Sequence, residues 1–242
     1  MKYWKIVPIG RSKIKFIVGG EKMAKYVMSD LHGCYHKFKE MLNLIDFKDE
    51  DELYIIGDIL DRGDKPLEIL DYIVAHKNIQ LLKGNHEKMF QEFYEMGNYY
   101  LWYCNGGQTT HSELLEKPYY YEDAMYKYIK NLQVIKIIDK FILVHAGLNF
   151  FNNYNELELK EFLSNQDEET CLWTRENIDN EKQFKDYTII CGHTPIQEIS
   201  NDYNEEVQIL KRKGTIYIDC GCCFENGKLA CLRLDDMKEF YD

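Results

Sequence analysis

The sequence has no long apolar run. Its apolar stretches are only a few residues long, such as Phe141 to Val144, whereas a membrane-spanning helix needs about 20. The N-terminal segment MKYWKIVPIGRSKIKFIVGG also lacks the continuous apolar core and the cleavage site of a signal peptide. We therefore expect a cytoplasmic protein that does not cross a membrane.

Basic residues are scarce relative to acidic ones. The chain has 30 lysines and arginines against 41 aspartates and glutamates, which gives a net charge of −11. Because nucleic acids and anionic membranes are bound by clustered lysine and arginine, this charge argues against a broad footprint for either partner. Individual basic residues in a cleft could still bind a phosphate group.

The sequence also lacks a Pro- or Ser-rich linker, a low-complexity tract and an internal repeat. A length of 242 residues with 45% hydrophobic residues fits a single domain with a sizeable core. Met23 stands directly before the first strand that carries a motif, so we expect residues 1–22 to be an N-terminal extension and residues 23–242 to be one domain. The alternating segment KIKFIV of the extension could add an edge strand.

No second C-x-x-C pair accompanies the cluster of Cys220, Cys222 and Cys223, which argues against a structural zinc site. The other five of the eight cysteines lie among apolar neighbours. We expect buried, reduced thiols at these positions.

Five short apolar runs share one pattern, because each is typical of a buried strand and ends in a small residue beside a potential metal ligand. The runs and their ends are KYVM before Ser29-Asp30-Leu31-His32, ELYII before Gly57-Asp58, IQLLK before Gly84-Asn85-His86, FILV before His145-Ala146-Gly147, and YTIIC before Gly192-His193-Thr194-Pro195. Helical patterns at 35–45 and 67–74, the second with Asp64 as its expected cap, separate the first three runs and predict parallel strands in an α/β domain. Ligands collect at the carboxyl ends of such strands, so we expect the five polar ends to converge on one edge of a sheet.

These ends supply two carboxylates, one amide and three imidazoles, namely Asp30, His32, Asp58, Asn85, His145 and His193. Oxygen and nitrogen donors without thiolate suit Mn, Fe, Zn or Ni, and the set is too rich for one ion and sufficient for two. Asp30 and His32 would face the same ion if their strand extends that far, because residues i and i+2 of a strand share a face. Taken singly, an Asp-Gly pair is usually a turn and a buried histidine is usually a hydrogen-bonded core residue, but five such coincidences favour one site.

The blocks SDLHG, GDILDRG, GNHE, VHAGL and CGHTP resemble, in this order, the signature blocks of the phosphoprotein phosphatase family of calcineurin-like metallophosphoesterases. The resemblance covers about Lys25 to Pro195, and YIDCGC with GKLACLRL resembles the closing strands of bacterial members. Ser29 departs from the pattern, since the family usually has glycine there, and this small residue should not disturb the ligands. The resemblance implies an α/β fold with a central β-sandwich of two mixed sheets flanked by helices.

The resemblance also implies a role for each matching residue. One metal would be held by Asp30, His32 and Asp58, and the other by Asp58, Asn85, His145 and His193. Arg62 and Arg175 would bind phosphate oxygens, although Arg175 could instead be a surface cation stacked on Trp173. His86 would be the general acid, oriented by Asp61.

The implied reaction is metal-dependent hydrolysis of a phosphoester by a hydroxide that bridges two divalent ions, with manganese expected first. A serine/threonine protein phosphatase acting on phosphorylated proteins is the first interpretation, because WYCNGGQTT resembles a stretch in small bacterial enzymes of that kind. The alternative is a symmetrical bis(5′-nucleosyl)-tetraphosphatase, a dinucleoside polyphosphate hydrolase. An alternative of another class is a non-catalytic, metal-bound regulatory protein, against which the intact residues for leaving-group chemistry argue.

Overall fold

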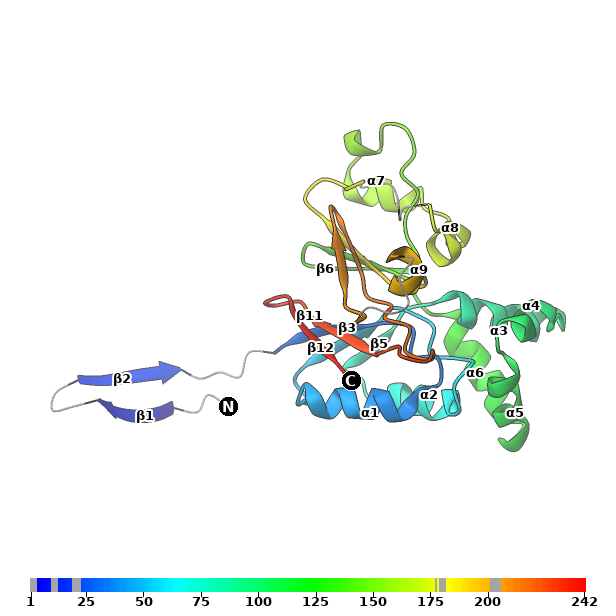
Figure 1. Cartoon of the computed structure of the whole chain (residues 1–242), viewed down its shortest axis with the longest axis horizontal. Helices are drawn as coiled ribbons and strands as arrows, with labels where there is room; N and C mark the ends of the chain where they lie inside the picture. Colours follow the sequence, from blue (N-terminus) through cyan, green and yellow to red (C-terminus); the bar gives the residue numbers. More distant parts are fainter. Residues whose placement is uncertain (1–3, 10–12, 19–22, 177, 179–181, 201–205) are drawn as a thin grey trace.

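A computed structural model of the chain describes residues 4–9, 13–18, 23–176, 178, 182–200 and 206–242. Its body consists of two five-stranded mixed sheets with helices around them (Figure 1). The α/β fold predicted from the sequence, a β-sandwich of two mixed sheets flanked by helices, is confirmed.

The first sheet contains the strands that carry the first three motifs, in the order β12-β11-β3-β4-β5. Its strands are β3 (Lys25–Met28), β4 (Glu52–Ile55), β5 (Ile79–Leu81), β11 (Ala230–Arg233) and β12 (Lys238–Tyr241). β3, β4 and β5 are parallel, as predicted, and α1 (Tyr35–Leu44) and α2 (Pro66–Ala75) connect them. Asp64 is not the cap of α2, because the helix begins after Lys65 and has no side-chain cap.

The second sheet has the order β6-β7-β8-β10-β9. Its strands are β6 (Ile135–Ile138), β7 (Phe141–Val144), β8 (Thr188–Cys191), β9 (Leu210–Arg212) and β10 (Thr215–Tyr217). β8 pairs in parallel with both β7 and β10, while β9 and β10 form an antiparallel hairpin. All five motif-bearing strands, β3, β4 and β5 of the first sheet and β7 and β8 of the second, therefore have a parallel neighbour. Their carboxyl ends point the same way within each sheet.

Helices fill the connections between the sheets. β5 and β6 are joined by α3 (Asn85–Met96), α4 (Tyr100–Cys104), α5 (Gln108–Glu116) and α6 (Tyr120–Lys130). The 3₁₀ turn η1 (Tyr154–Glu156), α7 (Leu159–Ser164) and α8 (Glu168–Trp173) lie between β7 and β8, and α9 (Ile196–Ser200) follows β8. In Figure 1, α1 and α2 cover the outer face of the first sheet.

Alternation along β3 divides its side chains between two hydrophobic cores. Val27 packs in the core shared with the second sheet, whereas Tyr26 and Met28 pack in the core beneath the helices. Since successive residues of a strand point to opposite faces, both faces of this strand are buried and a run of apolar residues is required. Full burial of such a side chain contributes roughly 1.5–3 kcal/mol.

Gly57 allows the ends of β4 and β5 to approach each other. Its φ is 94°, and a Cβ there would lie 2.6 Å from the Cα of Gly84 and 2.7 Å from Nδ1 of His145. A side chain at either glycine would push the strand ends apart. This close approach brings Asp58 and Asn85, the residues that follow the two glycines, to the same place.

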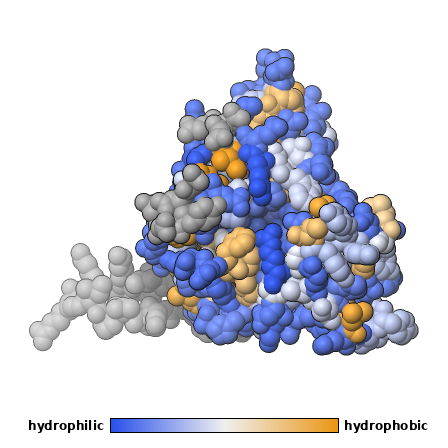
Figure 2. Space-filling view, turned by 45° about the vertical axis from the view of Figure 1, so that its right-hand side comes forward, coloured by the Kyte–Doolittle hydropathy of each residue, from blue (hydrophilic) through white to orange (hydrophobic). Residues whose placement is uncertain are grey.

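The surface in Figure 2 is mostly hydrophilic, with small, separate hydrophobic patches. No helix among the described residues is long and apolar enough to span a membrane, and a cytoplasmic location stays a prediction. All eight cysteines are free thiols, as expected. Of the five that were expected to be buried, Cys104 is exposed and Cys34 is half-buried.

The N-terminal extension contains β1 (Trp4–Ile9) and β2 (Lys13–Val18), which pair with each other as a separate two-stranded sheet. The segment KIKFIV is thus a strand, but it does not add an edge to either five-stranded sheet. Figure 1 shows the hairpin projecting from the body.

We expect a chain that begins at Met23 to stay folded, because both five-stranded sheets and both hydrophobic cores lie after this residue. Its thermal unfolding midpoint should stay within about 2 °C of that of the full chain, since no core contact is lost. Differential scanning calorimetry of the two purified chains tests this. An insoluble product, or a midpoint lowered by many degrees, would show that the extension is part of the domain.

Candidate metal centre

The predicted ligands lie just beyond the strand ends, in loops from both sheets. Asp30 and His32 follow β3, and Asp58 follows β4. His145 and His193 follow β7 and β8 of the second sheet. The expectation that all five polar ends share one edge of one sheet is therefore wrong, because the site forms where the ends of two sheets meet.

Several of these residues have a left-handed backbone. The φ angles of Asp30, His32, Asp58 and His193 are 52°, 42°, 55° and 67°. Each such residue costs on the order of 1–3 kcal/mol and persists only where its surroundings hold it. Asp30 and His32 therefore do not face one ion as residues i and i+2 of a strand, since β3 ends at Met28 and the loop turns sharply after it.

Hydrogen bonds between the loops hold this strained backbone. The N–H of His32 donates to the carbonyl of Asp58 at 2.9 Å, and that of Asp30 donates to the carbonyl of Gly57 at 3.3 Å. The loop after β3 is thereby fastened to the loop after β4. The ligands of both loops hold their relative positions through the backbone.

Asp58 is shared by two groups of side chains that could each hold a metal ion. One group is His32, Asp58 and His86, and the other is Asp58, His145 and His193. Oδ2 of Asp58 lies 3.7 Å from Nε2 of His32 and 3.3 Å from Nε2 of His145. One carboxylate between two sets of imidazoles has the arrangement that a pair of bridged divalent ions needs.

The histidines present their Nε2 atoms to this carboxylate because Nδ1 is engaged elsewhere. Nδ1 of His32 donates to the carbonyl of Leu60 at 2.9 Å, and Nδ1 of His145 donates to the carbonyl of Ile56 at 2.9 Å. A backbone carbonyl that holds one ring nitrogen fixes the tautomer and leaves the lone pair of the other nitrogen for a metal. Both rings are thus prepared as ligands.

Atoms with lone pairs face one another around His145. Its Nε2 lies 2.7 Å from Oδ1 of Asn85 and 3.3 Å from Oδ2 of Asp58, and Nδ1 of His193 lies 3.1 Å from the same oxygen of Asn85. Such a cluster attracts positive charge. Burial alone would lower the pKa of His145, but the charge of Asp58 raises it to about 10. Divalent metal ions would supply this positive charge, so the donor set fits a metal.

The charges of Asp58 and His193 agree with metal binding. Burial raises the pKa of Asp58, but the neighbouring His145 and His86 lower it more, so that it lies well below its usual value and the group is ionised. Burial lowers the pKa of His193 to about 3, which keeps this imidazole neutral. An ionised carboxylate and a neutral imidazole are the forms that coordinate metals.

Asp30 lies beside both groups but belongs to neither of them. Its Oδ2 accepts hydrogen bonds from the N–H of His193, at 3.0 Å, and from the hydroxyl of Ser29. The serine that stands in place of the usual glycine therefore contacts a predicted ligand directly.

His86, Asp61 and Arg62 form a second cluster at the same place. Nδ1 of His86 lies 2.6 Å from Oδ2 of Asp61, and its Nε2 lies 3.1 Å from Nη2 of Arg62. Nη1 of Arg62 also donates to Nε2 of His32 at 2.8 Å, so Arg62 must leave that nitrogen before His32 can bind a metal through it. The sequence analysis had placed Asn85 and His86 at the end of a strand. In the structure they are instead the first two residues of α3.

Residues 23–221, more than half of the chain, match the family described as calcineurin-like phosphoesterase. The chain belongs to this family. The family implies a dinuclear centre of divalent metals, which the two groups around Asp58 fit.

Curated relatives of this phosphoesterase include two proteins named symmetrical bis(5′-nucleosyl)-tetraphosphatase. The protein of Erwinia tasmaniensis is 30% identical over 131 residues, which is 52% of this chain and 45% of that relative. The protein of Proteus mirabilis is 27% identical over 130 residues, again 52% of this chain and 45% of the relative. The matched part of the chain thus spans about half the length of these curated relatives.

Solved structures similar to this phosphoesterase share its fold at low identity. A candidate diadenosine tetraphosphatase has a TM-score of 0.65 and 16% identity, with 92% of this chain and 94% of that chain covered. A cold-active protein-tyrosine phosphatase of a Shewanella species has a TM-score of 0.58 and 20% identity, with 90% and 80% covered. A serine/threonine phosphatase of Saccharomyces cerevisiae has a TM-score of 0.57 and 15% identity, with 91% and 79% covered.

Two residues that the sequence analysis did not single out hold Asp61 in this phosphoesterase. Nε1 of Trp102 donates to the two carboxylate oxygens at 3.0 and 2.8 Å, and the hydroxyl of Thr110 donates to Oδ1 at 2.6 Å. Both belong to the segment WYCNGGQTT, whose Gly106 carbonyl also accepts from the N–H of Arg62 at 3.2 Å. The segment was noticed as a resemblance, but its role in fixing the Asp61–Arg62 turn needs the tertiary contacts.

Glu87 was also missed, although it is the last residue of the GNHE block. Its carboxylate is fully buried and accepts from the N–H groups of Asp58, Ile59 and Gly84 at 2.8, 3.0 and 2.8 Å. It thereby fastens the start of α3 to the loop after β4. Burial, with the nearby charge of Asp58, raises the pKa of Glu87 to about 7.

Arg175 lies at the rim of the site. Its side chain is 57% exposed, and Nη1 lies 3.4 Å from Oε2 of Glu198. The pKa of His193 is lowered by burial first, then by the charge of His145, and further by the charge of Arg175. The ring of Trp173 faces His193, with 6.2 Å between the ring centroids.

Asp58→Asn should lower the metal content and remove most of the activity, because one carboxylate serves both groups. Asp46→Asn is the matched control, since Asp46 is also an aspartate with positive φ, at 50°, but is exposed after α1. Metal content by inductively coupled plasma mass spectrometry and hydrolysis of an aryl phosphate test both variants.

The expected outcome is a loss of at least one ion per chain in Asp58→Asn only. Full metal content with normal turnover in that variant would overturn the bridging role of Asp58. Equal losses in Asp46→Asn would attribute the effect to the left-handed backbone rather than to the carboxylate.

Proposed function

We propose that this phosphoesterase hydrolyses dinucleoside polyphosphates symmetrically, as a bis(5′-nucleosyl)-tetraphosphatase. Family membership makes phosphoester hydrolysis the reaction class. The observation that carries the substrate class is that the curated relatives, at up to 30% identity over 131 residues, bear this name. They favour the alternative from the sequence analysis over its first interpretation, a serine/threonine protein phosphatase.

Two arginines beside the metal centre would bind phosphate oxygens of the substrate. Arg62 contacts His32 and His86 of the first group, while Arg175 acts on His193 of the second. Arginine suits each position because its planar fork donates paired hydrogen bonds to phosphate oxygens.

The metal ions would be held by Asp30, His32 and Asp58 on one side and by Asp58, Asn85, His145 and His193 on the other, and we propose manganese first. When bound, two divalent ions supply a nucleophile from water at neutral pH and stabilise charge on the phosphoryl group.

The side chains of the protein would bind the phosphate and protonate the leaving group. Arg62 turns from the histidines to the phosphate and neutralises charge that develops on its oxygens, as Arg175 does from the rim. Nε2 of His86 is then free to hold the proton that the leaving oxygen needs. Burial lowers the pKa of His86, but Asp58 and Asp61 raise it more, which favours the protonated form. Asp61, fixed by Trp102 and Thr110, keeps the ring in place.

Serine/threonine protein phosphatase activity is the second candidate, on the sequence resemblance alone. The segment that resembles small bacterial phosphatases of this kind, WYCNGGQTT, supplies Trp102 and Thr110 to Asp61 and a carbonyl to Arg62. These contacts hold Asp61 beside His86, the proposed general acid, and would do so for either substrate. They do not favour a phosphopeptide over a polyphosphate.

A substrate panel with the manganese-loaded enzyme tests the proposal. The panel comprises diadenosine tetraphosphate, a phosphoserine peptide and p-nitrophenyl phosphate. We expect the highest kcat/KM for diadenosine tetraphosphate, with ADP as the sole nucleotide product. A higher kcat/KM for the peptide would replace the proposed function by the second candidate, and ATP with AMP as products would contradict symmetrical cleavage.

His86→Asn should keep both metal ions and lose activity in proportion to how much the leaving group needs a proton. General-acid catalysis contributes about 10²–10⁴-fold, so the loss should reach this range on a phosphoserine peptide and be smaller on p-nitrophenyl phosphate. His76→Asn is the control, because Nδ1 of His76 is also hydrogen-bonded, to the carbonyl of Tyr72 at 2.7 Å, outside the site. The ratio of kcat/KM for the two substrates, with metal content measured alongside, is the readout.

Equal losses on both substrates with intact metal would assign His86 to substrate positioning. Loss of metal would make it a ligand, which its membership of the first group with His32 and Asp58 also allows.

A further inference from the structure

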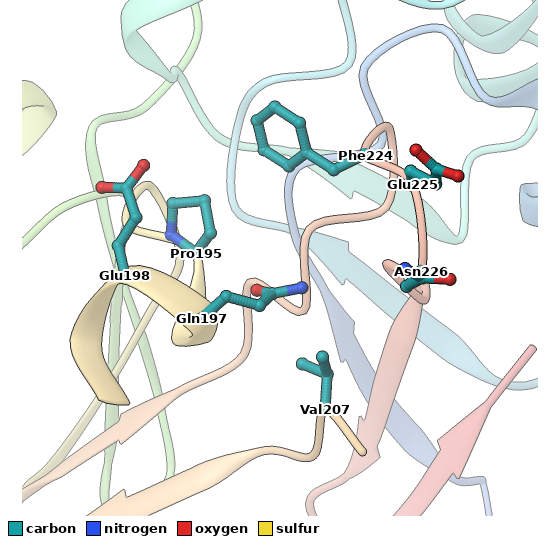
Figure 3. A pocket seen from close by; sticks show the side chains of 7 residues that line it. All are labelled: Pro195, Gln197, Glu198, Val207, Phe224, Glu225 and Asn226. Atoms are coloured by element: carbon teal, nitrogen blue, oxygen red, sulfur yellow. The ribbon is translucent and has the colours of Figure 1, made fainter. Parts of the chain in front are cut away.

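A pocket of about 250 Å³ lies between the loop that follows β8 and the segment that precedes β11 (Figure 3). Pro195 and the first turn of α9, with Gln197 and Glu198, form one wall, and the segment Phe224 to Asn226, between β10 and β11, forms the opposite wall. Pro195 is two residues after the predicted ligand His193. The pocket is thus built on the same loop as the metal centre.

Both arginines of the proposed phosphate site contact a wall of this pocket. The guanidinium carbon of Arg62 lies 5.6 Å from the ring centroid of Phe224, within the range of a cation–π contact. Arg175 pairs with Glu198 at 3.4 Å. A phosphate chain held by the arginines therefore has its next chemical group at the mouth of the pocket.

Gln197 brings a buried hydrogen-bond acceptor to the pocket. The residue is 7% exposed, and its Nε2 donates to the carbonyl of Cys220 at 3.2 Å. Because that carbonyl can only accept, the amide orientation is fixed and Oε1 is left facing away from it. Oε1 has no hydrogen-bond partner among the residues that the structure describes. A buried acceptor without a partner costs free energy that a ligand with an N–H group would recover.

Phe224 supplies the second feature, an aromatic face. It is 48% exposed although it is large and apolar, and in Figure 3 its ring projects toward Pro195, above Gln197. Planar bases stack on such rings in a way that tolerates different sequences. The carboxylates of Glu198 and Glu225 at the rim repel a further phosphate and accept hydrogen bonds from neutral donors.

We propose that this pocket is a nucleobase subsite that selects bases with an exocyclic amino group, which stack on Phe224 and donate to Oε1 of Gln197. Adenine meets this requirement. Hypoxanthine has a carbonyl oxygen in place of the amino group, so two hydrogen-bond acceptors, this oxygen and Oε1 of Gln197, would face each other. The inference rests on the proposed dinucleoside polyphosphate hydrolysis and specifies which part of the substrate each wall of the pocket recognises.

The test compares ADP with inosine diphosphate as competitive inhibitors of p-nitrophenyl phosphate hydrolysis by the manganese-loaded enzyme. The two nucleotides differ at the position of the amino group. For the wild-type chain, we expect the inhibition constant of ADP to be about tenfold lower, because a buried acceptor left without a donor is costly. Gln197→Leu should reduce this ratio to about one.

Gln91→Leu is the matched control. Gln91, on α3, is about as buried as Gln197, at 8% exposed. Its amide accepts from Lys83 and donates to Glu95, and none of the three residues lines the pocket. The ADP preference should persist in this variant. If it disappears there too, the effect of Gln197→Leu is a general consequence of losing a buried amide, and the subsite assignment is wrong.

Phe224→Leu provides a second measurement that does not depend on a buried position. Loss of stacking should raise both inhibition constants roughly tenfold or more and leave their ratio unchanged. Unchanged constants in this variant, or equal constants for the two nucleotides in the wild-type chain, would overturn the subsite. So would a Gln197→Leu effect on a phosphoserine peptide alone, which would assign the pocket to a peptide side chain.

The two proposals fail in different ways. Turnover of diadenosine tetraphosphate without any ADP preference keeps the proposed function and removes the subsite. An ADP preference that depends on Gln197, without turnover of the tetraphosphate, keeps the subsite and removes the proposed function.

Discussion

The structure of the site depends on one buried negative charge, the carboxylate of Asp58. Its oxygen Oδ2 lies near imidazoles of both groups. Its backbone carbonyl and N–H hold the loop of His32 and the carboxylate of Glu87. Burial of an ionised carboxylate is costly unless positive charge or hydrogen-bond donors surround it. The histidines, Arg62 and the predicted metal ions meet that requirement, so the same charge that must be compensated for stability organises the chemistry.

Strain and close packing accompany this arrangement. Asp30, His32, Asp58 and His193 have left-handed backbones, and Asp61 and Arg62 do as well, with φ of 70° and 67°. The sheets hold these loops because parallel strands end together and because Gly57 and Gly84 bring two of the ends into contact. A rigid sandwich with two buried cores can sustain several unfavourable residues at its edge, which a small or loosely packed domain could not.

The proposed phosphate site and the pocket are joined by shared side chains. Arg62 touches His32 and His86 on one side and the ring of Phe224 on the other, and Glu198 lines the pocket while it pairs with Arg175. A substrate that bears both phosphates and a base would engage metal ions, arginines and pocket in sequence. Hydrolysis of a phosphoprotein would use the first two of these and leave the acceptor of Gln197 without a defined partner.

The sequence by itself determined the strands and the residues at their ends. Short β-branched runs followed by Gly57-Asp58 or Gly84-Asn85 predict buried strands with polar ends, and the helical patterns between them predict parallel pairing, because these are local or near-local properties of the chain. The resemblance of the signature blocks alone was enough to name the six predicted metal ligands and four further site residues, Asp61, Arg62, His86 and Arg175.

Only the tertiary structure decided which of these ends meet and what supports them. The ligands come from two sheets rather than one, because the site depends on contacts between segments that are distant in the sequence. Examples are the 2.7 Å contact of Asn85 with His145 across 60 residues and the 3.0 Å contact of Asp30 with His193 across 163. The supports of Asp61 by Trp102 and Thr110, and the partnerless amide of Gln197, have no local signal. A hydrogen bond between distant residues depends on the packing of the whole domain, and no local sequence pattern determines that packing.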